Sequence, residues 1–207
     1  MSTNWVPRLV RLAAGLVLFG VSLALLVRAR LGLPAWDVLH QGLAHRTGLS
    51  FGMVINAVAV AVLLLWIPLR QRPGFGTLAN VVVVGLSADA ALAVLPPAGW
   101  LPAQVGLLLA GVVLNGIATG LYLGARLGPG PRDGLMTGLA ARGHSIRVVR
   151  TGIELAVLAV GWLLGGTVGV GTVLYAVAIG PLAHYFIPRL ELPARVPTVG
   201  ATASCPN

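Results

Sequence analysis

Long apolar runs without a single charge constrain this chain more than any other feature. The run Phe51–Leu69 is 19 residues long and the run Leu101–Ala125 is 25, and neither holds an acidic or basic side chain. About 20 apolar residues span the hydrocarbon core of a bilayer as a helix, whereas a soluble core helix needs a polar stripe. Charged residues make up only 9% of the chain, far below the roughly 25% of soluble domains. The sequence therefore predicts an all-α membrane protein.

The hydropathy pattern predicts six transmembrane helices. The tail that follows them, residues 191–207, contains three prolines and small polar residues, and we expect it to be disordered. Cys205 is the only cysteine, which excludes an intrachain disulfide. The helices are expected at about 9–28, 51–69, 75–95, 103–124, 148–164 and 170–187.

The basic residues predict an orientation. All 14 are arginines at the ends of apolar runs rather than in one patch, so we expect the lipid bilayer and no nucleic acid as partner. With the N-terminus inside, eleven arginines face the cytoplasm and only Arg28, Arg30 and Arg46 face outward, in accordance with the positive-inside rule. We therefore expect a multi-pass protein of the bacterial inner (cytoplasmic) membrane with both termini cytoplasmic. All five tryptophans lie near predicted helix ends and are expected at the headgroup level: Trp5, Trp36, Trp66, Trp100 and Trp162.

The chain contains an internal duplication. Residues 29–44 and 125–140 are identical at nine of 16 positions, and a Gly-x-Gly-Thr motif at 74–77 recurs at 169–172. These matches predict a first copy at 9–95 and a second at 103–188, each with three spanning helices. An odd number of spans reverses the second copy, so we expect two inverted repeats, a plan found in many secondary transporters.

Each copy holds a motif segment that is too polar to span the membrane. We expect short helices at 34–46 and 131–142, entered through chain-breaking glycines and begun by a proline. Such an element between two spans is typical of a re-entrant helix, which is tolerated at membrane depth only when it is buried or lines a cavity. The Gly-x-Gly-Thr motifs predict tight turns that open a helix, with threonine as the N-cap. The motif residues are Gly32, Pro34, Gly128, Pro131, Gly74, Gly76, Thr77, Gly169, Gly171 and Thr172.

Asp37 and Asp133 occupy equivalent positions in the two motif helices. In one interpretation they bind a cationic group or carry a proton during alternating access, with Arg30 and Arg126 tuning them. In the other, each acid favours the positive start of its own helix and pairs with one of those arginines. His40 stands three residues after Asp37 and could share its helix face. The sequence leaves both interpretations open.

Two further titratable groups lie within predicted spans. Glu154 follows Arg150 by four residues, which favours an ion pair on one helix face, although a binding role is a second interpretation. His184 is a candidate proton relay, or it hydrogen-bonds to the backbone. Small and amide residues are expected to let helices approach closely or to bond between them: Gly15, Gly20, Gly111, Gly116, Gly120, Asn56, Asn80 and Asn115.

Sequence motifs for catalysis are absent from the chain. It contains no Gly-x-Ser-x-Gly, no His-Glu-x-x-His, no pair of a cysteine with a histidine and no nucleotide-binding motif. We therefore expect no enzyme activity, no cofactor, no metal site and no ATP-driven transport.

The motifs taken together resemble the bacterial YczE/YyaS/YitT membrane proteins. The resemblance covers roughly residues 10–188 and implies an integral membrane protein, with some members linked to the production or export of secondary metabolites. It supplies no agreed active site. It is carried by Ala29–Asp37, Gly74–Thr77, Ala125–Leu135, Gly169–Thr172 and Gly180–Pro181.

Two classes of function are favoured by the sequence over a third, a channel, for which it offers few pore-lining residues. The inverted repeat and the paired acids favour a small secondary transporter, a proton-coupled exporter of a small amphiphilic or cationic metabolite. The alternative is a membrane scaffold that transports nothing and binds a partner complex. A homodimer is compatible with both.

Overall fold

The computed structural model describes residues 5–143 and 145–192. Within these ranges the protein is all-helical, with eight α-helices and no strand. The tail expected to be disordered lies outside the described residues from 193 onward. The helices are α1 Trp5–Ala29, α2 Ala35–Thr47, α3 Phe51–Leu69, α4 Phe75–Val94, α5 Leu101–Gly124, α6 Pro131–Ala140, α7 Ile146–Leu163 and α8 Val170–Leu190.

Five of these helices are long and apolar enough to cross a membrane, namely α1, α3, α4, α5 and α8. Their bounds agree with the expected spans to within a few residues. Helix α7 occupies the place of the remaining expected span and is 18 residues long, but it carries Arg147, Arg150 and Glu154. It therefore does not meet the same criterion of apolarity.

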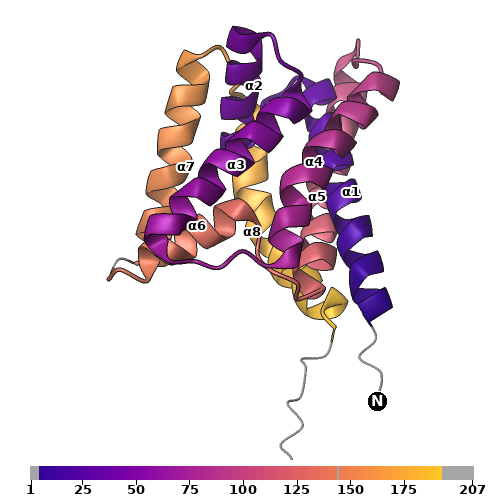
Figure 1. Cartoon of the computed structure of the whole chain (residues 1–207). Coiled ribbons are helices and arrows are strands. Elements are labelled where there is room, and N and C mark those ends of the chain that lie inside the picture. The colour runs from indigo at the N-terminus through magenta and orange to yellow at the C-terminus, as the bar shows by residue number, and fades with distance from the viewer. Residues whose placement is uncertain (1–4, 144, 193–207) are drawn as a thin grey trace, which may run out of the picture.

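The two short helices lie toward opposite ends of the bundle (Figure 1). Helix α2 rises to the end at which α3 begins, whereas α6 lies near the end at which α7 begins. The start of α1 and the end of α8 share the α6 end, where the Arg11 guanidinium donates to the Leu190 carbonyl at 2.7 Å. The α2 helix begins one residue later than expected because Pro34 precedes its first helical residue, whereas Pro131 is the first residue of α6 as expected.

Helices α1, α4 and α5 form the tightly packed part of the bundle. A methyl group added at Gly15 would lie 2.6 Å from the Tyr122 backbone nitrogen, and one at Gly20 would lie 2.6 Å from the Val84 carbonyl oxygen. The prediction that small residues bring helices together is confirmed at these crossings. Fully buried side chains such as Leu16 fill the space between them.

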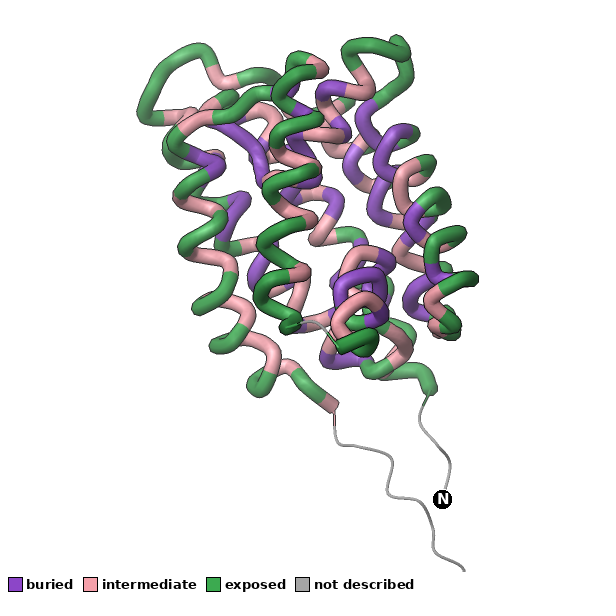
Figure 2. Tube along the Cα trace, turned by 90° about the vertical axis from the view of Figure 1, so that its left-hand side faces the viewer, coloured by how far each residue is buried: buried purple, intermediate pink, exposed green. Residues whose placement is uncertain are grey.

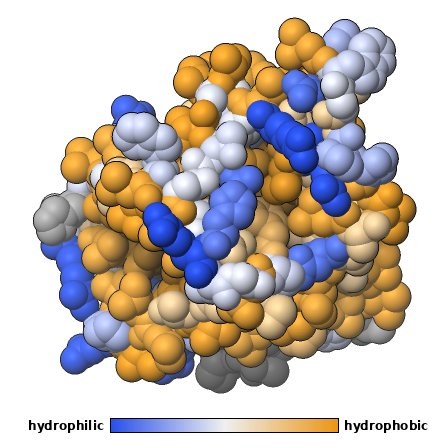
Figure 3. All heavy atoms as spheres, turned by 90° about the horizontal axis from the view of Figure 1, so that it is seen from above, coloured by the Kyte–Doolittle hydropathy of each residue, from blue (hydrophilic) through white to orange (hydrophobic). Residues whose placement is uncertain are grey.

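The outer surface is largely apolar. Exposed and half-exposed positions dominate α7 and α8 (Figure 2), and Gly161 is the buried residue of α7. Seen from the α2 end, most of the visible surface is hydrophobic, and hydrophilic residues lie over the middle and at parts of the edge (Figure 3). A largely apolar outer surface is the distribution that a lipid environment requires.

The segments that lead into α2 and α6 are held by the two Gly-x-Gly-Thr turns. The N–H of Gly171 donates to the Leu31 carbonyl at 2.7 Å, and the N–H of Gly76 donates to the Leu127 carbonyl at 2.8 Å. Each copy of the motif segment therefore rests on the turn of the other copy. Because these segments are not helical, the cross-bonds supply partners that their own backbone lacks.

The threonines of these turns have a different role from the one expected. Gly74 and Gly169 are the N-caps of α4 and α8, and Thr77 and Thr172 are the third helical residues. Each threonine hydroxyl accepts the N–H of its N-cap glycine at 3.2 Å. The Thr77 hydroxyl also donates to the Pro129 carbonyl at 2.8 Å, which ties the turn to the segment before α6.

Gly32 and Gly128 are tested by replacement with alanine. Their φ angles are +113° and +131°, and an added Cβ would lie 2.6 Å from the Gly169 nitrogen or 2.8 Å from the Thr77 hydroxyl. We expect each variant to lose about 2–4 kcal/mol of unfolding free energy, measured by chemical unfolding in detergent. The control is Gly48→Ala, since Gly48 has a φ of +73° but no atom within 4 Å of an added Cβ. An equal loss in all three variants would show that the cross-contacts contribute nothing.

Candidate functional site

A central cavity of about 610 Å³ lies inside the bundle. Residues from all eight helices border it, and the starts of α2 and α6 meet there. Its volume falls in the range of roughly 300–1,000 Å³ that is typical of small-molecule sites. Apolar side chains of α3 and α8 share its wall with charged groups of α6 and α7.

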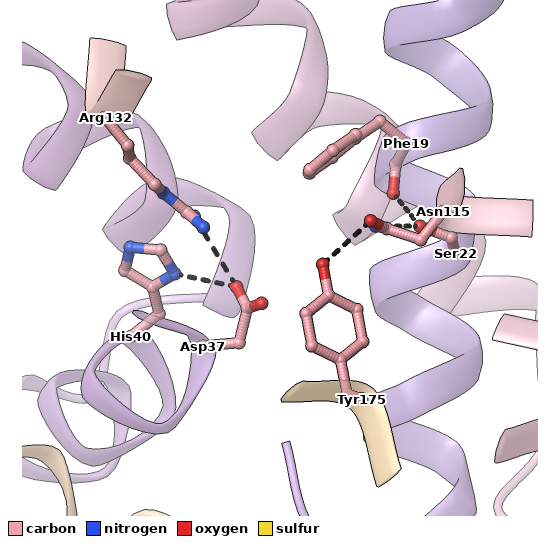
Figure 4. Close-up of polar contacts among 7 residues, drawn as sticks. All are labelled: Phe19, Ser22, Asp37, His40, Asn115, Arg132 and Tyr175. Atoms are coloured by element: carbon pink, nitrogen blue, oxygen red, sulfur yellow. Dashed lines mark hydrogen bonds and ion pairs between the residues drawn. The ribbon is translucent and has the colours of Figure 1, made fainter. Parts of the chain in front are cut away.

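Asp37 lies in the chain between Trp36 and His40, which border the cavity, and its side chain is 1% exposed. Its carboxylate oxygen Oδ1 lies 3.0 Å from His40 Nδ1 and 3.7 Å from an Arg132 guanidinium nitrogen (Figure 4). The expectation that His40 shares the face of Asp37 is confirmed. Arg132 comes from α6, so this ion pair joins the two short helices across the centre of the bundle.

Arg132 also lies over the ring of Trp36, 5.1 Å from its centroid. Trp36 and Arg132 occupy equivalent positions in the two sequence copies, so one of the positions at which the copies differ forms a contact between them. The Trp66 indole N–H donates to the Pro131 carbonyl at 3.0 Å. Trp36 and Trp66 are 7% and 2% exposed, because both pack at the starts of the short helices. That the five tryptophans lie at the headgroup level stays a prediction.

Asp133 has a different environment from Asp37. Its oxygen Oδ2 accepts the Tyr122 hydroxyl at 2.9 Å, and within the described chain no arginine or histidine nitrogen lies within 4.0 Å of its carboxylate. The Tyr122 ring meets Phe19 edge to face with centroids 6.0 Å apart. Both aromatic side chains and Asp133 border the cavity.

A second chain of polar contacts borders the same cavity (Figure 4). The Tyr175 hydroxyl donates to Asn115 Oδ1 at 2.8 Å, and Asn115 Nδ2 donates to the Ser22 hydroxyl at 2.8 Å. The Ser22 hydroxyl in turn donates to the Phe19 carbonyl at 2.6 Å. This chain links α8, α5 and α1, and confirms the expected interhelical role of Asn115.

The expected pair of Arg150 and Glu154 is confirmed, with a nitrogen–oxygen distance of 3.0 Å. The two side chains are 58% and 38% exposed, and both border the cavity. Within residues 5–143 and 145–192, no group of three His, Cys, Asp or Glu side chains comes together to hold a metal ion.

Three of the predicted site residues lie away from this centre. Arg30 and Arg126 are exposed residues with φ angles of +56° and +55°, and Arg126 pairs with Glu191 at 2.6 Å rather than with an acid of the cavity. The prediction that these arginines tune Asp37 and Asp133 is therefore wrong, because each arginine ends a helix before the chain turns inward. His184 is exposed on α8 and does not border the cavity.

The cavity is closed along α3 and α4 and open along α7 and α8. Asp89 of α4 accepts the Gly52 N–H at 2.7 Å and the Ser50 hydroxyl, which fastens α3 to α4 at the α2 end. An added Cβ at Gly85 would lie 2.3 Å from the Gly52 carbonyl oxygen, whereas one at Gly180, its equivalent, would have no neighbour within 4 Å. Helix α7 packs on α2 and α6, and α8 packs on α5. Helices α7 and α8 are not packed on each other, and the cavity reaches Thr151 near the start of α7 and Ile187 near the end of α8.

Comparison with known proteins places the chain in a family. A family model matches residues 6–188. The chain belongs to DUF6198, described as a family of unknown function. It is 42% identical over 185 residues to an uncharacterized protein of Haemophilus influenzae, covering 89% of this chain and 84% of the relative. No solved structure matches the chain.

Two relatives from Bacillus subtilis support the same assignment. The chain is 36% identical over 182 residues to the uncharacterized membrane protein YczE, covering 85% of this chain and 83% of YczE. It is 28% identical over 184 residues to the uncharacterized protein YyaS, covering 86% and 90%. The resemblance to the YczE and YyaS proteins is thereby confirmed. Together with the five long apolar helices, it makes this member of DUF6198 a membrane protein.

Sequence reasoning missed several residues of the cavity. Arg132 stands beside Asp133 in the second motif, but its pairing with Asp37 depends on the meeting of α2 and α6. Tyr122 and Tyr175 lie within long apolar helices, where a single tyrosine gives little signal. A polar hydroxyl deep in a predicted span is the one feature that could have identified them.

The Asp37–Arg132 contact is tested by a double-mutant cycle. We expect Arg132→Met to reduce the unfolding free energy by about 1–3 kcal/mol, because Asp37 would stay buried with His40 as its remaining partner. The effect stays below that of a fully buried pair because the Arg132 side chain is 28% exposed. The Asp37→Asn/Arg132→Met variant should lose less than the sum of the single losses. Strict additivity in chemical unfolding would mean that the two charges do not interact.

Proposed function

We propose that this protein is a small secondary transporter that works by alternating access, a proton-coupled exporter of a small amphiphilic or cationic metabolite. One observation carries the proposal: the starts of two short helices meet at a central cavity that is bordered by charged side chains. Transporters commonly place their site where broken helices begin, near the middle of the membrane. Ionisable groups inside a membrane bundle are costly and mark substrate or ion pathways.

The proposal includes two inverted repeats of three spans, with α7 as the sixth span. It is supported by the matched cross-bonds, in which Gly171 binds the segment before α2 and Gly76 binds the segment before α6. It is further supported by the positions of α2 and α6 toward opposite ends of the bundle. The arginine distribution supports a cytoplasmic location for the α6 end, which carries the start of α1 and the end of α8.

The difference between the two helix pairs supports alternation. In the described state α3 and α4 are fastened by Asp89, and α7 and α8 are apart. His184 stands at the position equivalent to Asp89, and Ser145 at that of Ser50. We propose that α7 closes on α8 while α3 leaves α4, which would move the opening from the cytoplasmic end to the outer end.

Proton coupling is assigned to the buried cluster of Asp37 and His40. These titratable groups lie 3.0 Å apart at the start of α2 and contact Arg132 of α6. A change of charge on Asp37 would alter the attraction between the two short helices. The proton would in this way bias the equilibrium between the two states.

The double variant Asp37→Asn/Asp133→Asn tests the transport function. In everted vesicles with an established pH gradient, compounds that the wild type exchanges for protons should dissipate the gradient, measured with a fluorescent pH probe. The panel contains quaternary ammonium compounds and amine-bearing amphiphiles. We expect the double variant to lose this response while its thermal unfolding in detergent stays cooperative.

Glu191→Gln is the matched control, since Glu191 pairs with Arg126 away from the cavity. It removes one carboxylate and should leave the response unchanged. Transport that survives in the double variant would overturn the site. A wild type that responds to no compound, and that no compound stabilises, would favour the scaffold function instead.

The proposed open state is tested by thiol accessibility in a Cys205→Ser background. We expect Thr151→Cys and Ile187→Cys, which border the cavity near the start of α7 and the end of α8, to react with an impermeant reagent in everted vesicles only. Val54→Cys on α3, where the wild-type side chain is 3% exposed, should resist the reagent in both vesicle orientations. Labelling of Thr151→Cys in right-side-out vesicles alone would reverse the proposed orientation.

A further inference from the structure

We propose that the cavity takes an organic monocation, with its ammonium or similar group on the Asp133 carboxylate and its apolar body toward the gap between α7 and α8. This inference rests on the proposed transport function and assigns its substrate class. It also separates the two acids that the sequence presents as equivalents. Asp133 contacts the substrate, and Asp37 is a partner within the protein.

The two carboxylates that border the cavity, and Asp37 next to it, differ in their counter-ions. Asp37 has Arg132 at 3.7 Å and His40 at 3.0 Å, and Glu154 has Arg150 at 3.0 Å. Asp133 has one neutral donor, the Tyr122 hydroxyl at 2.9 Å. A carboxylate in a bundle interior without a cation is incompletely compensated. A cationic ligand would supply the charge that the described part of the protein does not place there.

The summed charge at the cavity favours the same class. Asp133 and Glu154 border the cavity together with Arg132 and Arg150, and Asp37 adds a third carboxylate through its contact with Arg132. Three carboxylates against two guanidinium groups leave one negative charge when His40 is neutral. A monocation would neutralise this negative charge, whereas a carboxylate or phosphate ligand would at least double it. Electrostatic complementarity of this kind governs which ligands a site rejects.

Two aromatic rings stand beside the unpaired acid. Tyr122 donates its hydroxyl to Asp133 and meets Phe19 edge to face, and both rings border the cavity. Aromatic faces attract organic cations through the ring quadrupole, and this attraction grows when the cation is desolvated. The pair therefore provides a wall suited to a quaternary or substituted ammonium group.

The apolar part of the ligand would lie against the side of the cavity that α7 and α8 form. Leu155 and Leu158 of α7 and Ile179 of α8 line this side, and an adjoining hollow of about 340 Å³ shares Leu155 and Leu158 with it. A fully polar cation would leave these surfaces in contact with water. A cation with an aromatic or aliphatic body would cover them and gain from their burial.

An anionic ligand is the competing class, because helix starts and arginines attract anions. The positive starts of both short helices already have a carboxylate nearby, since Asp37 lies in the first turn of α2 and Asp133 in the first turn of α6. The Arg132 guanidinium is directed to Asp37 and lies over the Trp36 ring. An anion would have to displace one of these acids from its helix.

Two ions of nearly equal size and shape distinguish the classes. Tetraphenylphosphonium is a lipophilic cation, and tetraphenylborate is its anionic counterpart; benzyltrimethylammonium serves as a smaller cation. Binding is measured on the purified full chain in detergent, by thermal unfolding and by equilibrium dialysis. We expect at least one cation to raise the unfolding temperature and tetraphenylborate to leave it unchanged.

Substitutions of single acids test whether Asp133 is the residue that binds the cation. Asp133→Asn should bind the cation roughly ten- to hundredfold more weakly, whereas Asp133→Glu should restore part of the affinity. Glu191→Gln, which removes an acid paired with Arg126 away from the cavity, should bind within a fewfold of the wild type. Cooperative unfolding of each variant without ligand provides the check on folding.

Binding of tetraphenylborate, wild-type affinity in Asp133→Asn, or no shift with any of the three ions would overturn the assignment. Exchange of another class of compound for protons would leave the transport function standing while this inference falls. Cation binding that depends on Asp133 without any flux in vesicles would support this inference while the transport function falls.

Discussion

The structure depends on how two non-helical segments satisfy their backbone inside the bundle. Between α1 and α2, and again between α5 and α6, the chain leaves the helical conformation, and within a membrane its N–H and C=O groups must find partners in the protein. The carbonyls of Leu31 and Leu127 find them in the N–H groups of Gly171 and Gly76. Because each bond crosses from one sequence copy to the other, neither copy can place its short helix alone. The position of the cavity follows from this exchange.

The meeting of α2 and α6 explains why charges are tolerated at the centre. Asp37 is 1% exposed and would be too costly without partners, but Arg132 reaches it from the other helix and His40 from the next turn. The ion pair and the stacking of Arg132 on Trp36 replace water as the surroundings of these charges. Because these contacts join α2 to α6, a change of charge on Asp37 or His40 would change the attraction between the two short helices.

The two copies differ where the proposed function needs a difference. Asp89 fastens α3 to α4, and the equivalent His184 is exposed on a helix that stands apart from α7. Gly85 is in close contact with Gly52, whereas Gly180 faces open space. Similar sequences therefore occupy different environments in one state of the molecule. In alternation between two states, the two helix pairs would exchange these environments.

Much of the architecture was accessible from the chain alone. Apolar runs predicted the long helices to within a few residues, because a membrane demands about 20 apolar residues for each span. The Gly-Pro punctuation predicted both short helices, since glycine and proline act on the local backbone. Sequence spacing also predicted the pairs of His40 with Asp37 and of Arg150 with Glu154, because residues three or four apart share a helix face.

The contacts between distant segments were decided only by the tertiary structure. Arg30 and Arg126 each precede one of the paired acids by seven positions and were expected to act on them, yet the chain turns inward after them and leaves both outside. Arg132 pairs with an acid 95 positions away in the chain, and Tyr122 reaches Asp133 from the preceding helix. The sequence determined the helices and their short-range pairs, because hydropathy and helical spacing act over a few turns. The tertiary structure decided which acid keeps a counter-ion, because that depends on which helix starts meet at the centre.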